Sequence, residues 1–334
     1  MFKNKKILVT GGTGSIGSEI VRQLLNYEPE VIRVFSRDES KQFFLQQENS
    51  EHKNVRYLVG DIRDKERLVY ASKDIDYIFH AAALKHVPSC EYNPFEAVKT
   101  NVIGVQNLIE AAITNNVKKV VAISTDKVVN PMNTMGATKL LSERLVLAAE
   151  HYKGNAPTIF SCVRFGNVMG SRGSVIPLFK YQIENNKPLT ITDNQMTRFM
   201  MSIPQAASLV LNASKYSQGG EVFVLKMPVL KIKELAETLS EDYLKKYPNG
   251  KKVDINEIGI RPGEKLYEEL MTIEESERAY ENEKMFVILS HLQEELVSPI
   301  GFKKAVRKAY SSHDADMLSK EEILSLLKEV NLDF

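Results

Sequence analysis

Several features that would place a protein in a particular class are scarce in this sequence of 334 residues. It has two cysteines, Cys90 and Cys162, too few and too isolated for a disulfide framework, so we expect reduced thiols and no bound metal. The formal net charge of +1 provides no long-range field that would attract nucleic acid. No apolar run approaches the roughly 18 residues that span a bilayer, so no membrane protein is expected.

The N-terminal segment begins as a signal peptide would but does not continue as one. Met1–Lys6 is basic, yet the apolar run that follows, Ile7–Val9, is far too short for a signal peptide and is followed by glycines. We therefore expect a cytoplasmic protein.

Short β-branched runs alternate with helical patterns through the first half of the chain. Apolar residues spaced along one face predict helices at residues 16–25, 96–113 and 135–150. The predicted strands are residues 7–10, 31–35, 55–59, 77–80, 120–124 and 160–164. This alternation is typical of βαβ units and predicts an α/β fold, with a Rossmann-type parallel sheet and helices on both faces.

The second half of the chain is less regular. Helical patterns near 203–214 and 232–244 are separated by glycine and proline clusters, and a capping box at Ser319 and Glu322 predicts a helix near the end. We expect a Rossmann domain over residues 1–166. Residues 167–334 should form mainly a smaller C-terminal lobe, with some segments returning to the sheet.

A glycine-rich turn joins the first predicted strand to the first predicted helix in the pattern G-x-x-G-x-x-G. Glycines here permit a tight turn, close approach of backbone to a pyrophosphate and packing of helix on strand, while the helix N-terminus attracts an anion. The pattern predicts a dinucleotide-binding domain. The expected contacts in this turn are Gly11, Thr13, Gly14, Ser15, Ile16 and Gly17.

The residues after the second strand bear on which dinucleotide binds. Ser36, Arg37 and Lys41 suit the 2′-phosphate of NADP, whereas Asp38 is the acidic residue that NAD would need for its ribose hydroxyls. We expect NADP, with NAD as the alternative, although Arg37 and Lys41 are otherwise ordinary surface charges. Further cofactor contacts are expected from Asp61 (otherwise a helix N-cap), Ile62, Ala81, Ala82 and Ala83.

After the fifth strand the chain reads Ser124-Thr125-Asp126-Lys127, and Met135-Gly136-Ala137-Thr138-Lys139 follows. With these blocks the chain resembles the extended short-chain dehydrogenases/reductases. More narrowly, it resembles the UDP-N-acetylglucosamine 4,6-dehydratases of bacterial surface-glycan and flagellin-glycan synthesis. The matching blocks are residues 10–17, 36–42, 80–88, 124–127, 164–168, 170–175, 196–199 and 261–265.

The resemblance implies a three-step reaction on UDP-N-acetylglucosamine. Hydride leaves C4 for the nicotinamide, water is eliminated across C5 and C6, and the hydride returns to C6 to give a UDP-4-keto-6-deoxy-N-acetylhexosamine. Lys127 is the expected base for the C5 proton and Asp126 the acid for the 6-hydroxyl; Thr125 would bind the 4-oxygen and Lys139 the nicotinamide ribose. A neutral Lys127 requires a lowered pKa, from burial or a nearby cation. The members that invert C5 match better than those that retain it.

Met135 occupies the tyrosine position of the family's Tyr-x-x-x-Lys element, as it does in some members of this family. A thioether cannot take a proton, so the acceptor of the 4-hydroxyl proton is open. Methionine here argues against one alternative, a UDP-hexose 4-epimerase, which needs the tyrosine. It is consistent with another alternative, a non-catalytic NADP-sensing protein.

Local groups must hold the substrate, because the chain carries so little net charge. Arg198 and Arg261 are the first candidates for the diphosphate, since a guanidinium matches phosphate geometry; Arg172 either joins them or orders its own loop. By resemblance the protein is a homo-oligomer, a dimer or a hexamer, with helices 96–113 and 135–150 as possible interfaces. Residues that resemble positions holding the sugar, diphosphate or uridine are Lys85, Asn167, Thr197 and Glu264.

Overall fold

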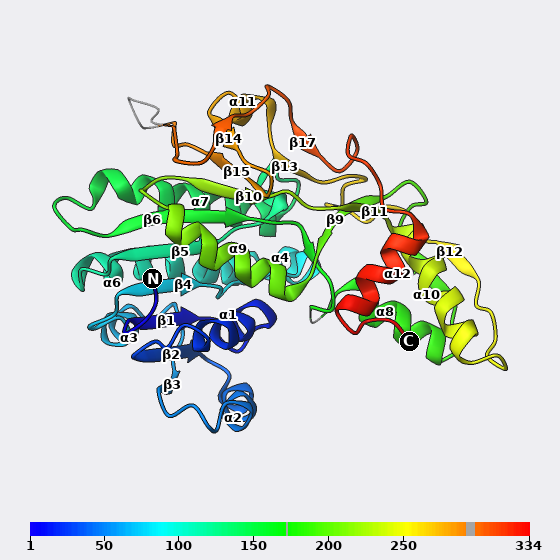
Figure 1. The fold of residues 1–334 in the computed structure, drawn as a ribbon, viewed down its shortest axis with the longest axis horizontal. Coiled ribbons are helices and arrows are strands. Elements are labelled where there is room, and N and C mark those ends of the chain that lie inside the picture. Colours follow the sequence, from blue (N-terminus) through cyan, green and yellow to red (C-terminus); the bar gives the residue numbers. More distant parts are fainter. Residues whose placement is uncertain (172, 292–297) are drawn as a thin grey trace.

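The computed structural model describes residues 1–171, 173–291 and 298–334. A larger lobe surrounds a ten-stranded sheet, and a smaller lobe lies at one end of it (Figure 1). Arg172 lies outside the described residues.

Six parallel strands form one side of the sheet, in the order β3-β2-β1-β4-β5-β6 with β3 at its edge. They are β1 (Lys6–Thr10), β2 (Val31–Ser36), β3 (Val55–Val59), β4 (Tyr77–His80), β5 (Lys119–Ile123) and β6 (Ile159–Arg164). This is the Rossmann strand order, and it reverses between β1 and β4, where such sheets bind ligands at the carboxyl ends of the strands. The predicted Rossmann-type fold is confirmed.

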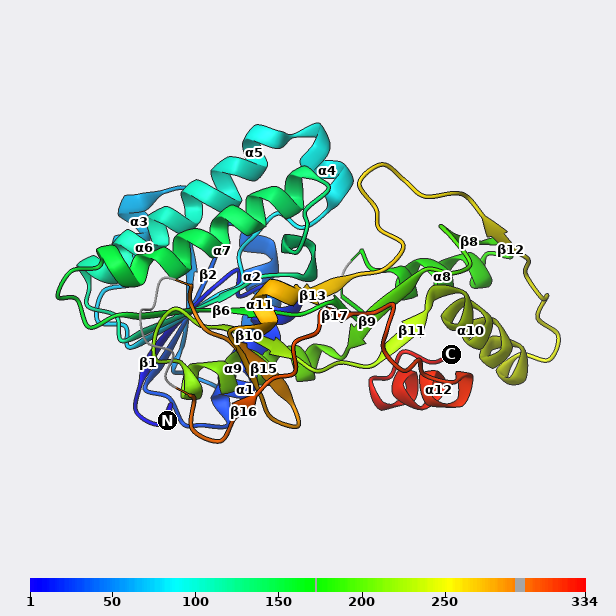
Figure 2. The same ribbon diagram turned by 90° about the horizontal axis from the view of Figure 1, so that it is seen from above.

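Helices cover both faces of the sheet (Figure 2). On one face lie α3 (Lys65–Ala71), α6 (Gly104–Thr114) and α7 (Thr134–Tyr152); on the other, α1 (Ser15–Leu25) packs against α9 (Ile203–Tyr216). The helix predicted at 96–113 is interrupted: a π-helical turn, η1 (Lys99–Ile103), joins α5 (Pro94–Val98) to α6. Apolar spacing cannot reveal the wider turn. The remaining helices of the first half are α2 (Glu39–Glu48) and α4 (Val87–Tyr92).

Segments from the second half extend the sheet. β10 (Val222–Leu225) pairs in parallel with β6, and β15 (Met285–Ile288), β14 (Ala279–Glu281) and β16 (Lys303–Lys304) continue it with antiparallel pairing. One apolar cluster of buried side chains joins the sheet to its helices.

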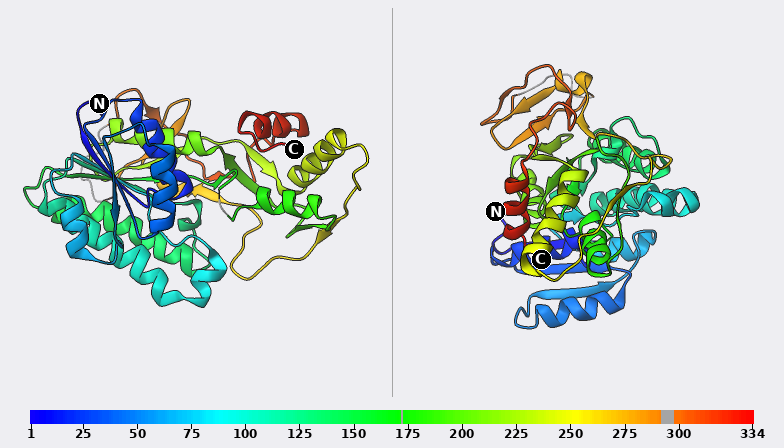
Figure 3. Two further views of the ribbon diagram at one scale, coloured as in Figure 1. Left: turned by 90° about the horizontal axis from the view of Figure 1, so that it is seen from below. Right: turned by 90° about the vertical axis from the view of Figure 1, so that its right-hand side faces the viewer.

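The smaller lobe has an apolar cluster of its own, which includes Phe179, Leu235 and Leu327. Figure 3 shows this lobe beyond one end of the strands of the sheet. The predicted capping box at Ser319 and Glu322 is confirmed at the start of α12. The elements of this half are β7 (Asn167–Val168), α8 (Val175–Glu184), β8 (Leu189–Ile191), β9 (Thr197–Met201), β11 (Val229–Lys231), α10 (Ile232–Lys246), β12 (Ile255–Glu257), β13 (Glu269–Met271), α11 (Ile273–Ser276), β17 (Tyr310–Ser311) and α12 (Lys320–Glu329).

No helix within the described parts of the chain combines the length and the apolar character needed to cross a membrane.

Candidate active site

The glycine-rich turn after β1 is packed too closely for larger side chains. Gly11 has a φ of +67°, and a Cβ on it would lie 2.6 Å from the backbone nitrogen of Ala82. A Cβ on Gly17 would collide with the carbonyl oxygen of Gly11. Gly14 occupies the N-cap of α1 and has no side chain to cap it. The start of α1 therefore lies close to the sheet edge with its backbone unobstructed by a cap, an arrangement that suits a pyrophosphate.

Polar groups after β2 are engaged with one another. Thr13 Oγ1 lies 2.8 Å from Ser36 Oγ. Asp38 caps α2 by accepting a hydrogen bond from the Lys41 backbone N–H, and it also pairs with the Lys41 ammonium. The side chain of Arg37 is 60% exposed, with one nitrogen 3.8 Å from Asp61. Arg37 is thus the more accessible of the two cations predicted to contact a 2′-phosphate.

Asp61 is not a helix cap, because Asp64 caps α3. Asp61 instead accepts hydrogen bonds from the backbone and guanidinium of Arg63. Burial alone would raise the pKa of Asp61, but the bonds from Arg63 outweigh it and hold the pKa below its ordinary value. Ile62 is buried. After β4, Ala81 and Ala82 are half-buried and Ala83 is exposed.

Thr125, Asp126 and Lys127 come together directly after β5, where a 3-10 turn, η2 (Asp126–Val128), begins. The Thr125 hydroxyl donates to Asp126 Oδ1 at 2.7 Å, and Lys127 Nζ donates to the same oxygen at 3.0 Å. The side chain of Asp126 is 1% exposed and that of Lys127 is 26% exposed. A second carboxylate, Glu268, lies 3.2 Å from Lys127 Nζ.

These neighbours change the expected protonation of Lys127. Burial tends to lower the pKa of its ammonium, but the charges of Asp126 and Glu268 outweigh burial and raise the pKa above 10.5. The expected lowering of this pKa is therefore wrong for this structure. To act as an amine, Lys127 must therefore pass its proton to a carboxylate neighbour or to water.

Helix α7 carries both Met135 and Lys139, and it places Lys139 at the end of β5. Lys139 Nζ donates to the Ile123 carbonyl at 2.6 Å, and burial lowers the pKa of Lys139. Met135 is buried in a small cluster with Cys90 and Ala97.

Asn101 was not predicted as a site residue, yet it ties two site segments together. Its amide donates to Thr138 Oγ1 at 3.1 Å and to the Leu84 carbonyl at 3.0 Å, and its oxygen accepts from the Leu84 N–H at 2.8 Å. Asn101 lies in the π-helical turn η1. Because the sequence does not predict this turn, it does not predict the contacts of Asn101 either.

A buried network of ion pairs connects the segments around the end of β5. Arg164, at the end of β6, is 2% exposed and donates two hydrogen bonds to Glu143 and two to Glu275. Glu143 also accepts a 2.6 Å hydrogen bond from the Ser124 hydroxyl. The network therefore holds β5, α7 and α11 in one arrangement. Burial tends to raise the pKa of Glu275, but Arg164 outweighs it and lowers the pKa.

A cavity of about 190 Å³ lies beside Lys127, between the sheet edge and the segments of the second half. Asn133 caps α7 and donates to the Gly263 carbonyl at 2.9 Å, which ties one wall of the cavity to α7. Five residues predicted for catalysis or substrate binding meet here, namely Lys127, Asn167, Arg198, Arg261 and Glu264. The other lining residues are Val87, Pro88, Met132, Asn133, Pro262, Gly263, Lys265 and Glu268.

Arg198 lines the cavity but is engaged by the protein itself. It donates to the carbonyls of Thr197, Lys265 and Leu266, and its Nε lies 3.5 Å from Glu268. The side chain of Arg261 is 54% exposed. Arg261 is therefore the more accessible of the two guanidinium groups predicted to contact the diphosphate.

Two other residues predicted to bind the substrate, Thr197 and Lys85, are not among the described residues that line this cavity. The Thr197 hydroxyl is buried 2.9 Å from Ser312 Oγ and is thus used within the fold. Lys85 is exposed on the segment after β4.

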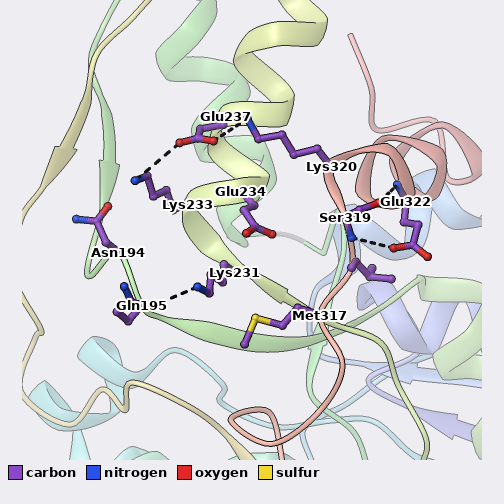
Figure 4. Close-up of a pocket in the computed structure, with 11 residues that line it drawn as sticks. Asn194, Gln195, Lys231, Lys233, Glu234, Glu237, Met317, Ser319, Lys320 and Glu322 are labelled. Atoms are coloured by element: carbon purple, nitrogen blue, oxygen red, sulfur yellow. Dashed lines mark hydrogen bonds and ion pairs between the residues drawn. The ribbon is translucent and has the colours of Figure 1, made fainter.

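A larger cavity, of about 530 Å³, lies in the smaller lobe between α10 and α12 (Figure 4). Two of its lysines pair with carboxylates: Lys320 with Glu237 and Glu241, and Lys233 with Glu237. Figure 4 shows the pairs with Glu237, and shows Lys231 bonded to Gln195. None of its described lining residues comes from the carboxyl edge of the sheet, so it is not the candidate active site.

Known proteins are similar to this chain. The family described as "Polysaccharide biosynthesis protein" matches residues 7–290. The chain is 47% identical over 290 residues to the UDP-N-acetylglucosamine 4,6-dehydratase (inverting) of Campylobacter jejuni, covering 86% of this chain and 84% of that one. It is 42% identical over 342 residues to a protein named UDP-glucose 4-epimerase from Rickettsia bellii, covering 100% and 98%.

A solved structure is also similar. The X-ray structure of Pen from Bacillus thuringiensis superimposes with a TM-score of 0.92 at 50% identity, covering 98% of each chain. The chain therefore belongs to the polysaccharide biosynthesis protein family of extended short-chain dehydrogenases/reductases, as its motifs predict.

Proposed function

We propose that this protein is a UDP-N-acetylglucosamine 4,6-dehydratase, a lyase that uses NADP and inverts C5. The contact between Asp126 and Lys127 at the end of β5, beside a cavity, carries the proposal. Eliminating water requires one group that removes a proton and another that protonates the leaving hydroxyl, and this pair supplies both. The name of the Campylobacter relative, which includes inversion, supports the assignment.

The carboxyl edge of the sheet fits a nicotinamide dinucleotide. Gly11 and Gly17 allow the close turn, and the start of α1 after Gly14 suits the pyrophosphate. Arg37 would bind the 2′-phosphate of NADP, while Asp38, the acid that NAD would need, already caps α2. Lys139 would hold the nicotinamide ribose. When bound, the dinucleotide accepts the hydride of C4 and later returns it to C6.

Thr125 offers a route for the 4-hydroxyl proton that does not need a tyrosine at position 135. Its hydroxyl donates to Asp126 at 2.7 Å. A sugar 4-hydroxyl that donates to Thr125 Oγ1 passes its proton through that hydroxyl to Asp126 as hydride leaves C4. Asp126 thereby becomes the carboxylic acid that the elimination requires.

The elimination then uses both members of the pair. The new 4-ketone acidifies the C5 hydrogen, which Lys127 removes as an amine. Asp126 gives its proton to the 6-hydroxyl, which leaves as water. The planar C5 of the intermediate then turns its opposite face to Lys127, which returns a proton there as hydride reaches C6, so that C5 is inverted. Lys127 ends as the amine and Asp126 as the carboxylate with which these steps began.

We propose that residues 1–166 bind the cofactor and that residues 167–334 mainly bind the sugar nucleotide. Arg261 is the proposed contact of the diphosphate, because its guanidinium borders the cavity and is partly exposed. Asn167 and Glu264 are proposed contacts of the sugar or uridine.

Two other functions compete with this one. The name of the Rickettsia relative favours a 4-epimerase, but an epimerase returns hydride to C4 and has no use for an acid–base pair acting across C5 and C6. A non-catalytic NADP sensor is consistent with Met135, but it requires no contact between Asp126 and Lys127.

We also propose a cytoplasmic homo-oligomer. The thiols of Cys90 and Cys162 are free and buried, in keeping with a reducing compartment. Tyr92 and Phe95 are 88% and 80% exposed, and Leu141 on the adjacent α7 is 50% exposed, which gives an apolar surface for a second copy. Sedimentation of the parent and of Phe95→Glu tests the assembly; a monomeric parent refutes it.

One incubation separates the three functions. Pure protein is supplied with UDP-N-acetylglucosamine and NADP in deuterated water, and the sugar is followed by mass spectrometry and NMR. A dehydratase forms a product that lacks one water and carries deuterium at C5. An epimerase changes only the configuration at C4, and a sensor leaves the sugar unchanged; either result refutes the proposal.

A further inference from the structure

Glu268 is a buried carboxyl group with no role in the steps above. It directly precedes β13, and Ser312 holds it from both sides: the Glu268 N–H donates to Ser312 Oγ and the Glu268 carbonyl accepts from the Ser312 N–H, each at 2.9 Å. Its side chain is 4% exposed and borders the same cavity as Lys127. Ser312 therefore holds the main chain of Glu268 in place beside the cavity.

The two carboxyl oxygens of Glu268 have different surroundings. Oε1 lies 3.2 Å from Lys127 Nζ and 3.5 Å from Arg198 Nε. Oε2 is buried and has no hydrogen-bond partner within the described part of the chain. An ionised oxygen buried without a donor is costly, and a proton removes that cost.

Three segments of the chain contact Glu268, and two of them carry charged side chains. Asp126 and Lys127 face it from η2 and Arg198 from β9, while the uncharged Ser312 follows β17. Burial and the charge of Asp126 raise the pKa of Glu268 above 4.5, despite the opposing effect of the two cations. The site thus favours a protonated Glu268 more than water does.

We propose that Glu268 is the proton store of Lys127: it takes a proton from the Lys127 ammonium before the elimination and returns it after the product has formed. This proposal rests on the proposed function, because it matters only if Lys127 acts as an amine. Glu268 does not contact the reacting atoms itself. It acts through Lys127, whose protonation state it sets.

Proton balance shows why a second carboxyl is needed. Asp126 receives the 4-hydroxyl proton and holds it until the 6-hydroxyl leaves, so it has no capacity for the Lys127 proton during that interval. Transfer from Lys127 to Glu268 gives an amine and a carboxylic acid. The amine takes the C5 proton and later returns one to C5, and Glu268 then restores the ammonium. No proton is gained or lost beyond the water released.

Glu268→Gln tests the proposal, because glutamine keeps an acceptor for the Lys127 ammonium but cannot store its proton. In the parent, the proton moves within the site and kcat is flat across neutral pH. In E268Q, Lys127 must lose its proton to water, so kcat near neutral pH falls by about 10²–10⁴ and rises about tenfold per pH unit on the alkaline side. Hydride transfer from C4 continues, so reduced nicotinamide accumulates and C5 takes up deuterium slowly.

Two matched variants accompany it. Glu269→Gln changes the next carboxylate, which accepts a hydrogen bond from Asn130, and keeps the activity and pH profile of the parent. Glu268→Asp retains a carboxyl group and restores part of the neutral-pH rate.

A measurement on the protein alone checks the same group. Because the folded pKa of Glu268 lies above its ordinary 4.5, its contribution to stability is present below that pH and is lost as the pH rises through the folded pKa. The Tm of E268Q should therefore improve relative to the parent as the pH rises above 4.5.

The outcomes are distinguishable. A parent that forms no dehydrated product refutes the proposed function, and this proposal with it. A parent that forms product while E268Q matches its rate and flat pH profile refutes the Glu268 proposal alone. So does an E268Q that loses the same factor at every pH, since that loss is structural.

Discussion

Thr125→Val tests how the 4-hydroxyl proton leaves in a protein whose tyrosine position holds Met135. Valine keeps the shape of threonine and removes the hydroxyl that lies 2.7 Å from Asp126 Oδ1. A positioned proton transfer contributes about 10²–10⁴ in rate. We therefore expect kcat to fall by about 10²–10³, which corresponds to about 3–4 kcal/mol of barrier. The structural cost should be small, because the hydroxyl's other hydrogen bond, from the Lys127 N–H, is long at 3.4 Å.

Stopped-flow absorbance of reduced nicotinamide measures this step directly, because the loss falls on hydride transfer from C4. Substrate deuterated at C4 should give a larger isotope effect in the variant than in the parent. Thr125→Ser keeps the hydroxyl and should stay near the parent rate. Met135→Tyr added to Thr125→Val should recover part of the loss, because a phenol four residues before Lys139 supplies another acceptor. If Thr125→Val turns over as fast as the parent, Thr125 is not the proton route.

Further predictions concern the base, the buried network, pH and the cofactor. Lys127→Ala should abolish product while leaving NADP affinity within a few-fold of the parent by fluorescence titration, and turnover at the parent rate refutes it as the base. Arg164→Met leaves Glu143 buried without its cation and should lower the free energy of unfolding in urea by about 3–5 kcal/mol; an unchanged midpoint would show that the network is not stabilising. Burial lowers the pKa of His80 from 6.5 to about 3, so stability should be fully present above pH 6.5 and fall toward pH 3, by at most about 5 kcal/mol. Replacing His80 by Gln should flatten that part of the unfolding profile, and an equal slope in both proteins refutes the assignment. Arg37→Ala should weaken NADPH binding about 10–100-fold with little effect on NADH, measured as a ratio of Kd values; equal weakening of both excludes a 2′-phosphate contact.

The central sheet was predictable because its information is local. Each strand from β1 to β6 is a short apolar run next to a turn, and the structure places every one within a residue of its predicted ends. The π-helical turn at Lys99–Ile103 was not predictable, because one wider turn leaves the apolar spacing of the flanking helices nearly unchanged. Asn101 depends on that turn, so its contacts could not be predicted either.

In the candidate site, too, contacts between sequence neighbours were predictable and contacts between distant segments were not. Thr125, Asp126 and Lys127 are neighbours in sequence, so their proximity follows from the chain itself. Arg198 is predicted to contact the diphosphate, but the sequence does not show that backbone carbonyls 67 and 68 residues away accept hydrogen bonds from it. The pKa of Lys127 was predicted in the wrong direction for a similar reason: Glu268 reaches it from a distant segment.

The presence of Glu268 resolves a difficulty in the elimination pair. Adjacent Asp126 and Lys127 stabilise each other's ionised forms, whereas the reaction needs an acid and an amine. Asp126, Lys127, Glu268 and Arg198 form a contacting group of two carboxyls and two cations. Moving a proton from Lys127 to Glu268 leaves the total charge of this group unchanged. Such a transfer avoids the cost of placing a net charge in a buried site, which exchange of a proton with water would incur. A 4-epimerase has no step in which Lys127 must act as an amine, so it has no use for a carboxyl that takes the Lys127 proton. The contacts of Lys127 with Asp126 and Glu268 therefore favour elimination over epimerisation.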